Sequence, residues 1–143
     1  MINKERLLET FMEYVKIDSE TKNEKAISEK ILEDLKALGL DYYIDDAGKK
    51  VDSNGNNIYC FLPGTKEAES ILFSAHMDTV TPGIGIEPYI DGEYIKSKGE
   101  TILGGDDKSG VVAILEALRV IKENNLPHGP IEVVFSIYEE GGL

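Results

Sequence analysis

Three short segments of the sequence, SAHMD, GGDDKSG and YEEGG, carry side chains that could bind a metal ion or move a proton. The candidates are one imidazole and five carboxylates: His76, Asp78, Asp106, Asp107, Glu139 and Glu140. Carboxylates packed together repel one another, and some would have to take up protons unless a cation neutralised them. Imidazole and carboxylate ligands suit zinc, cobalt and manganese. The residue types therefore indicate a site for a divalent metal ion.

The spacing within the segments suggests separate tasks for neighbouring residues. In the pattern His-x-Asp, Asp78 lies close enough to His76 to orient its imidazole and to select the tautomer that coordinates a metal. Glu139 and Glu140 follow an apolar run, and adjacent side chains at the end of a strand point in opposite directions. We therefore expect one glutamate to bind metal and the other to handle a proton.

Each motif also has an ordinary structural interpretation. A His-x-Asp pattern is common by chance, and paired glutamates are usually solvated. The Asp106–Asp107 pair precedes a helical pattern, where acidic residues often cap the helix. The metal-site hypothesis depends on the three motifs lying together, which the elements between them must arrange.

The elements around the motifs predict such an arrangement. Residues 70–75 and 131–138 are apolar runs without polar alternation, typical of strands covered on both faces, and residues 108–123 have an apolar helical face between them. Strand, helix and strand in this order predict an α/β fold with a largely parallel or mixed sheet flanked by helices. The carboxyl ends of parallel strands form one edge, where ligands bind. We expect all three motifs at that edge.

The remaining pattern extends this α/β organisation. Helices are predicted at residues 4–17 and 23–38, the second ending at Gly39. Residues 40–45 and 57–62 read as strands, with Asn54–Gly55 as the hairpin turn between them. The Gly- and Tyr-rich residues 85–99 predict a turn and a short ribbon.

Composition limits the classes of partner. The chain has 143 residues with 41% hydrophobic content, enough for one domain with a core, and a formal net charge of −12. Such an acidic surface disfavours nucleic acid and anionic membranes as partners. No apolar run approaches a membrane span, so we expect a cytoplasmic protein. Cys60 is the single cysteine and reads as core filler.

Longer stretches around the motifs resemble a known family. SAHMDTVTPG, TILGGDDKSGVVAILEAL and YEEGGL are similar to the dinuclear-zinc metallopeptidase family of aminoacylases and carboxypeptidases, most nearly to its peptidase T-like tripeptidase branch. The resemblance implies a zinc-peptidase catalytic domain that hydrolyses peptide bonds in short peptides. It also implies two zinc ions per complete site, with cobalt or manganese as alternatives.

The resemblance assigns a role to each candidate residue. His76, Asp106 and Glu140 would be metal ligands, with Asp106 between the two ions across a cis peptide bond to the following residue. Asp78 would orient the imidazole, and Glu139 would act as general base.

Members of this family are longer than 143 residues. The resemblance therefore implies that residues 1–143 are the N-terminal part of the catalytic domain, without the lid and dimerisation domain and without the C-terminal part of the catalytic domain. We expect this stretch alone to be inactive, to expose an apolar sheet face and to self-associate through it, and we expect the full-length form to be a homodimer. The alternatives are a deacylase, dipeptidase or carboxypeptidase of the same family, or a non-catalytic metal-binding module.

Overall fold

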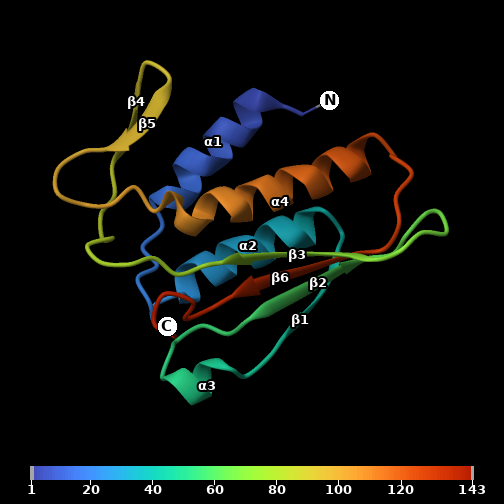
Figure 1. Cartoon of the computed structure of the whole chain (residues 1–143), viewed down its shortest axis with the longest axis horizontal. Coiled ribbons are helices and arrows are strands. Elements are labelled where there is room, and N and C mark those ends of the chain that lie inside the picture. Colours follow the sequence, from blue (N-terminus) through green and yellow to red (C-terminus); the bar gives the residue numbers. More distant parts are fainter. Residues whose placement is uncertain (1, 143) are drawn as a thin grey trace.

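The computed structural model describes residues 2–142, and Figure 1 shows its arrangement of helices and strands. The elements in chain order are α1 (Lys4–Val15), α2 (Lys25–Ala37), β1 (Asp41–Ile44), α3 (Gly48–Val51), β2 (Ile58–Leu62), β3 (Ile71–His76), β4 (Pro88–Asp91), β5 (Tyr94–Ser97), α4 (Gly105–Glu123) and β6 (Ile131–Ser136). Every helix and strand that the sequence predicts has a counterpart. The short helix α3 has no counterpart among the predictions.

The main sheet is mixed. Its strand order is β1-β2-β6-β3, and β4 and β5 form a separate two-stranded ribbon. Strands β3 and β6 are parallel, with Ile71 opposite Ile131 and His76 opposite Ser136. The β1–β2 and β2–β6 pairs are antiparallel. The predicted mixed α/β fold and its strand–helix–strand unit are therefore confirmed, and the parallel part of the sheet is the β3–β6 pair that carries the motifs.

Helices α1, α2 and α4 lie on the same side of the sheet (Figure 1). Alternate residues of β6 are buried beneath them, namely Ile131, Val133 and Phe135. Cys60 of β2 is buried in the same core, as predicted, and burial raises the pKa of its thiol to about 11. The core therefore forms between one helix layer and one sheet face.

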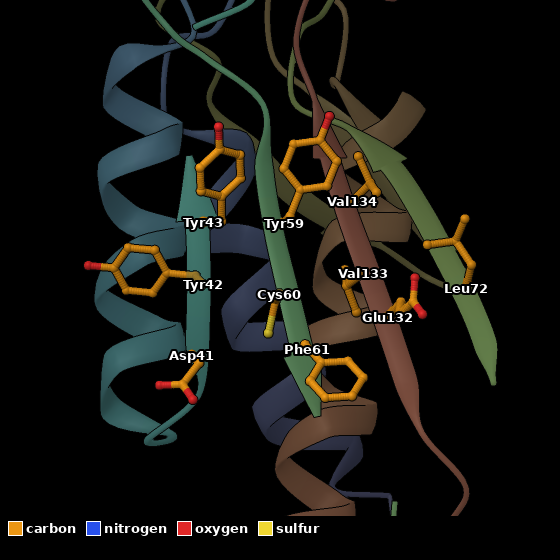
Figure 2. A pocket seen from close by; sticks show the side chains of 10 residues that line it. All are labelled: Asp41, Tyr42, Tyr43, Tyr59, Cys60, Phe61, Leu72, Glu132, Val133 and Val134. Atoms are coloured by element: carbon orange, nitrogen blue, oxygen red, sulfur yellow. The ribbon is translucent and has the colours of Figure 1, made fainter. Parts of the chain in front are cut away.

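The prediction that residues 70–75 and 131–138 are covered on both faces is wrong for the part of the chain that the structure describes. The second sheet face is exposed, with Tyr43, Tyr59, Phe61 and Leu72 between 38% and 65% accessible. Figure 2 shows these side chains around a cavity of about 340 Å³. Most of the apolar side chains of β3 are therefore exposed in residues 2–142. The expected uncovered apolar face is confirmed, and self-association through it stays a prediction.

Asn54–Gly55 is not a hairpin turn. The connection from β1 to β2 contains α3, and Asn54 Oδ1 accepts a hydrogen bond from Lys25 N at 2.9 Å. A Cβ on Gly55 would lie 3.0 Å from Glu24 Cβ, so a side chain here would push its neighbours apart by a few tenths of an ångström, and glycine avoids this. These residues therefore fasten the connection to the start of α2 instead of reversing the chain.

The helices end and pack as their sequences suggest. Gly39, with φ 64°, follows α2 in the left-handed conformation that ends many helices. The 19-residue α4 buries one face against the sheet and α1. No helix within residues 2–142 combines the length and apolar character that crossing a membrane requires.

An ion pair joins the start of α1 to the middle of α4. The Arg6 guanidinium donates from Nε and Nη2 to the Glu116 carboxylate, both at 2.8 Å. Glu116 is 3% exposed and also accepts from Asn3 N at 3.1 Å. Burial raises the pKa of Glu116, but the Arg6 hydrogen bonds outweigh it, and the pKa lies below its ordinary value of 4.5.

The variant Arg6→Met is expected to lower the free energy of unfolding by about 2 kcal/mol at neutral pH, because it leaves a buried carboxylate without its cation. A group with a lowered folded-state pKa stabilises above its unfolded pKa and loses that contribution as pH falls through the folded value. The difference between Arg6→Met and wild type should therefore shrink between about pH 7 and about pH 3 in urea unfolding. The same difference at both pH values would contradict the assignment. Lys25→Met, which removes an exposed pair with Glu29, is the control.

Candidate metal and catalytic site

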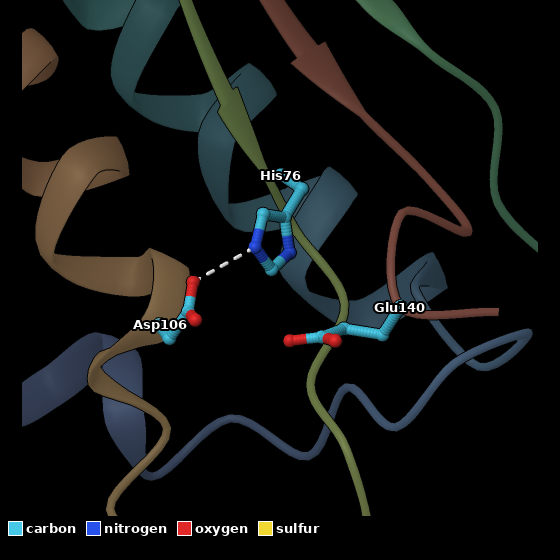
Figure 3. A group of neighbouring side chains, drawn as sticks. All are labelled: His76, Asp106 and Glu140. Carbon is cyan, nitrogen blue, oxygen red and sulfur yellow. Dashed lines mark hydrogen bonds and ion pairs between the residues drawn. The ribbon is translucent and has the colours of Figure 1, made fainter. Parts of the chain in front are cut away.

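Three of the predicted residues gather at the carboxyl edge of the β3–β6 pair. His76 is the last residue of β3, Asp106 lies at the start of α4, and Glu140 follows β6. One ligand atom from each lies within 4.8 Å of the others (Figure 3). His76 Nε2 is 3.0 Å from Asp106 Oδ1. The expected convergence of the three motifs is therefore present in the structure.

The adjacent aspartates at the start of α4 have different environments. Asp107 Oδ1 accepts a hydrogen bond from Gly110 N at 3.0 Å, so this residue caps the first turn of the helix. Asp106 has non-helical angles of φ −93° and ψ 105°. Its side chain is 85% exposed to solvent and contacts His76. The peptide bond between the two aspartates is cis, as the resemblance implied. The helix-cap interpretation thus applies to Asp107 and not to Asp106.

The His76 ring is held at Nδ1, which leaves Nε2 facing the cluster. Nδ1 lies 2.8 Å from the main-chain oxygen of Asp78 and 3.5 Å from its carboxylate. A proton on Nδ1 donated to that main-chain oxygen leaves the Nε2 lone pair for a ligand. In the absence of a cation, the hydrogen bonds that His76 donates to Asp78 and Asp106 raise its pKa to about 9, against the opposing effect of burial.

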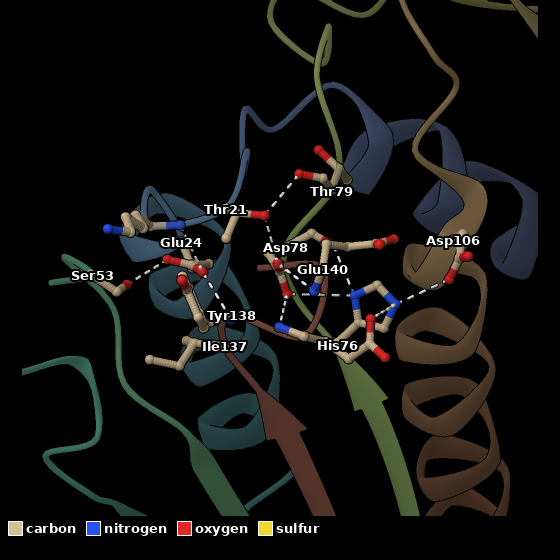
Figure 4. A network of polar contacts seen from close by, with 12 residues as sticks. Thr21, Glu24, Ser53, His76, Asp78, Thr79, Asp106, Ile137, Tyr138 and Glu140 are labelled. Carbon is tan, nitrogen blue, oxygen red and sulfur yellow. Dashed lines mark hydrogen bonds and ion pairs between the residues drawn. The ribbon is translucent and has the colours of Figure 1, made fainter. Parts of the chain in front are cut away.

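Asp78 is completely buried and holds several groups at once (Figure 4). Its carboxylate accepts from Thr21 Oγ1 at 2.8 Å, from Glu139 N at 2.9 Å and from Glu140 N at 3.1 Å. Burial raises the pKa of Asp78, but these hydrogen bonds and His76 outweigh it, so the pKa is lowered. Asp78 therefore contacts both the imidazole and the backbone of the glutamate pair.

The two glutamates do not diverge as the sequence predicted. Glu139 Oε2 lies 3.7 Å from His76 Nε2, and Glu140 belongs to the ligand cluster that also contains His76. Strand β6 already ends at Ser136, and Tyr138, with a left-handed φ of 58°, changes the direction of the chain before the glutamates. The side-chain alternation of a strand therefore no longer applies at the glutamates.

The donor set suits a divalent cation. His76 offers a nitrogen, and Asp106 and Glu140 offer carboxylate oxygens. Among residues 2–142, no lysine or arginine forms an ion pair with either carboxylate, so without a metal ion the one cationic group paired with the cluster is the His76 imidazolium. One imidazole and two carboxylates are ligands typical of zinc, cobalt and manganese.

A shallow cavity of about 320 Å³ adjoins the cluster. Its walls combine apolar side chains with the two candidate carboxylate ligands: Val80, Ile102, Leu103, Gly104, Gly105, Asp106 and Glu140. This composition suits a small molecule with an apolar part next to a group that faces the cluster. The other histidine, His128, lies in the connection before β6, at the opposite end of that strand, and takes no part in the site.

Comparison with known proteins gives the family. A model described as Peptidase family M20/M25/M40 matches residues 72–143, about half of the chain and all five residues proposed to act at the site. The chain belongs to this family. The motifs that carried the resemblance lie in the matched region, and the family match extends through β3, α4 and β6.

Individual relatives agree with the M20/M25/M40 assignment. The protein named Uncharacterized protein YqjE from Bacillus subtilis (strain 168) is 46% identical over 143 residues, covering 100% of this chain and 38% of that protein. A tripeptidase structure from Staphylococcus aureus subsp. aureus Mu50 matches with a TM-score of 0.96 and 48% identity. The aminopeptidase PepT structure from Bacillus cereus ATCC 10987 matches with a TM-score of 0.95 and 46% identity.

Both structures confirm the resemblance to the peptidase T-like branch and the fold. Each match covers 99% of this chain and 38% of the solved chain. The chain therefore spans well under half the length of the relatives that it matches.

Proposed function

We propose that this chain supplies metal ligands and the general base of a metal-dependent peptidase that hydrolyses short peptides, in the manner of a tripeptide aminopeptidase. The proposal rests on one observation: the His76 imidazole lies together with the Asp106 and Glu140 carboxylates, beside Glu139 and next to a small cavity. Membership of the M20/M25/M40 family and similarity to a tripeptidase and to PepT support the choice of reaction.

His76, Asp106 and Glu140 would hold the metal, with zinc as the first candidate and cobalt or manganese as alternatives. A bound divalent cation supplies Lewis-acid chemistry, which acidifies a water molecule and polarises a carbonyl. The resemblance implies two ions in a complete site, with Asp106 shared between them.

Glu139 would take a proton from water and later donate it to the leaving amine. Its carboxylate is 45% exposed, so that water and substrate can reach it, and Oε2 lies 3.7 Å from His76 Nε2. A carboxylate in this position can receive the proton as the water oxygen bonds to the amide carbon and return it as the carbon–nitrogen bond breaks. The products are a carboxylate and an amine.

Asp78 would hold His76 and the glutamate pair in fixed positions relative to each other. It is buried away from the cavity, so its role is to orient the imidazole and the Glu139–Glu140 backbone, without contact to substrate. The apolar side chains Val80, Ile102 and Leu103 would accommodate a side chain of the peptide.

The substrate class is tested on the complete gene product. Tripeptides with a free amino terminus should be hydrolysed with a kcat/KM at least about tenfold above matched dipeptides and N-acyl amino acids, a difference of about 1.4 kcal/mol. Steady-state assays with added Zn²⁺ or Co²⁺ give this ratio. Preference for an N-acyl amino acid would identify a deacylase, and preference for a dipeptide or a carboxy-terminal residue would identify a dipeptidase or carboxypeptidase. Stoichiometric metal without hydrolysis of any of these would identify a binding module.

The 143-residue stretch by itself is expected to be at least about 100-fold less active than the complete gene product. Within residues 2–142 the ligand cluster has three members, too few to hold two ions and also orient a peptide. Tripeptide hydrolysis by the isolated stretch in Zn²⁺ or Co²⁺ checks this. Comparable turnover that is abolished by Glu139→Gln would contradict the proposed need for further residues.

A further inference from the structure

The segment that carries Glu139 and Glu140 is held by side chains and not by the sheet. After β6 ends, four consecutive backbone N–H groups donate to side-chain oxygens. The pairs are Ile137 with Asn57 at 2.9 Å, Tyr138 with Glu24 at 3.1 Å, Glu139 with Asp78 at 2.9 Å and Glu140 with Asp78 at 3.1 Å. The position of both glutamates therefore depends on a few buried acceptors (Figure 4).

Glu24 is one of these acceptors, and it is completely buried. It precedes α2 without capping the helix through its side chain. Its Oε1 accepts from Lys22 N at 3.0 Å and from Tyr138 N at 3.1 Å, and its Oε2 accepts from Ser53 Oγ. A single carboxylate thus joins three segments that are far apart in the sequence.

The surroundings of Glu24 are closely packed. A Cβ on Gly55 would lie 3.0 Å from Glu24 Cβ and 3.4 Å from Ile137 Cγ2, so the connection before β2 packs tightly against Glu24 and the segment after β6. Tyr138, whose backbone N–H donates to Glu24, has φ 58°, a left-handed conformation that residues other than glycine seldom adopt. The Glu24 contact therefore acts at the point where the chain turns toward the site.

We propose that Glu24 is a positioning residue for the site: by holding Tyr138 N–H, its buried carboxylate places the Glu139–Glu140 turn against Asp78 and His76. The inference rests on the proposed function in taking Glu139 as base and Glu140 as metal ligand. The control of the turn by Glu24 can be tested independently of the proposed catalytic and metal-binding roles. Glu24 does not contact the N–H groups of Glu139 or Glu140, so an effect of Glu24 on those groups distinguishes positioning from a purely local contact.

Two substitutions at Glu24 and one elsewhere separate positioning from general stability. Glu24→Leu removes the acceptors at similar volume. Glu24→Gln keeps one oxygen for the two backbone donors and can donate its amide N–H to Ser53 Oγ. Arg6→Met lowers stability through the loss of the ion pair with Glu116 in the middle of α4, outside the ligand cluster. All are made in the complete gene product.

Hydrogen exchange of the metal-free protein, resolved by residue, is the first measurement. Glu24→Leu should speed exchange at the Glu139 and Glu140 amides by at least about tenfold, while Glu24→Gln stays within about threefold of wild type. Arg6→Met should not accelerate these two amides selectively. Acceleration confined to the Lys22 and Tyr138 amides would overturn the proposal.

Binding of Co²⁺, followed by its visible absorption, is the second measurement. Glu24→Leu should weaken binding by at least about tenfold, Glu24→Gln should restore it, and Arg6→Met should leave it unchanged. Wild-type affinity in Glu24→Leu would overturn the proposal. A wild-type protein that binds no Co²⁺ would remove the metal site of the proposed function, and the exchange result alone would then decide the role of Glu24.

Discussion

Glu139→Gln is expected to lower kcat for tripeptide hydrolysis by about 10³-fold while metal content stays at the wild-type level. Glutamine has the size of glutamate but cannot take up the proton released by water. Glu139 is 45% exposed beside the ligand cluster and lies outside the group of three residues whose ligand atoms converge. Loss of catalysis with retention of metal is therefore the specific signature of a general base.

Steady-state kinetics and metal analysis of the purified complete protein test this prediction. Glu132→Gln makes the same change on the exposed face of β6 and should leave kcat unaltered. A Glu139→Gln enzyme with kcat within about tenfold of wild type would show that another group handles the proton. Loss of metal in parallel with activity would instead place Glu139 among the ligands.

Chelation is expected to abolish hydrolysis, with recovery on addition of Zn²⁺, Co²⁺ or Mn²⁺, and His76→Ala should prevent that recovery. His76 is the only nitrogen donor in the cluster, and its loss leaves the Asp106 and Glu140 carboxylates facing each other. We expect metal affinity to fall by more than about 100-fold, beyond the range found when only a supporting residue is removed.

The matched control for His76→Ala is His128→Ala. His128 lies in the connection before β6, where its Nδ1 contacts the main-chain oxygen of Gly129. Its removal should change neither metal affinity nor activity, as measured by Co²⁺ titration and tripeptide assays. Wild-type metal affinity in His76→Ala would exclude the proposed ligand cluster.

Local sequence patterns were sufficient for the elements and for the edge at which the motifs meet. The apolar spacing of residues 108–123 identified α4, and the apolar runs on either side identified the strands that pair as β3 and β6. Periodicity is a property of consecutive residues, so it reports helices and strands directly. Connection order then predicts that His76, Asp106 and Glu140 lie at one edge of the sheet.

Sequence patterns could not assign coverage of the sheet or the Asn54–Gly55 segment. Apolar composition made β3 resemble a strand buried on both faces, yet Leu72 is 60% exposed because the packed helices lie on one face. Asn54–Gly55 has the composition of a hairpin turn, but its side chain and close backbone approach fasten it to α2. In both cases the outcome depends on which distant element lies nearby, information that a short window does not contain.

The sequence by itself determined the chemistry of the candidate residues. They are one imidazole and several carboxylates, on elements that bring them to a common edge. The residue pattern left Asp106 and Asp107 equivalent and the family resemblance chose Asp106, whereas the physical difference between them, Asp106 facing the cluster and Asp107 capping the helix, comes from the tertiary structure. It alone revealed Glu24 and the double contact of Asp78 with the glutamate backbone, since these hydrogen bonds join residues 61 to 114 positions apart. Side-chain identity determines which reactions are available. Contacts in the folded chain determine which of several residues of the same type can take part in them.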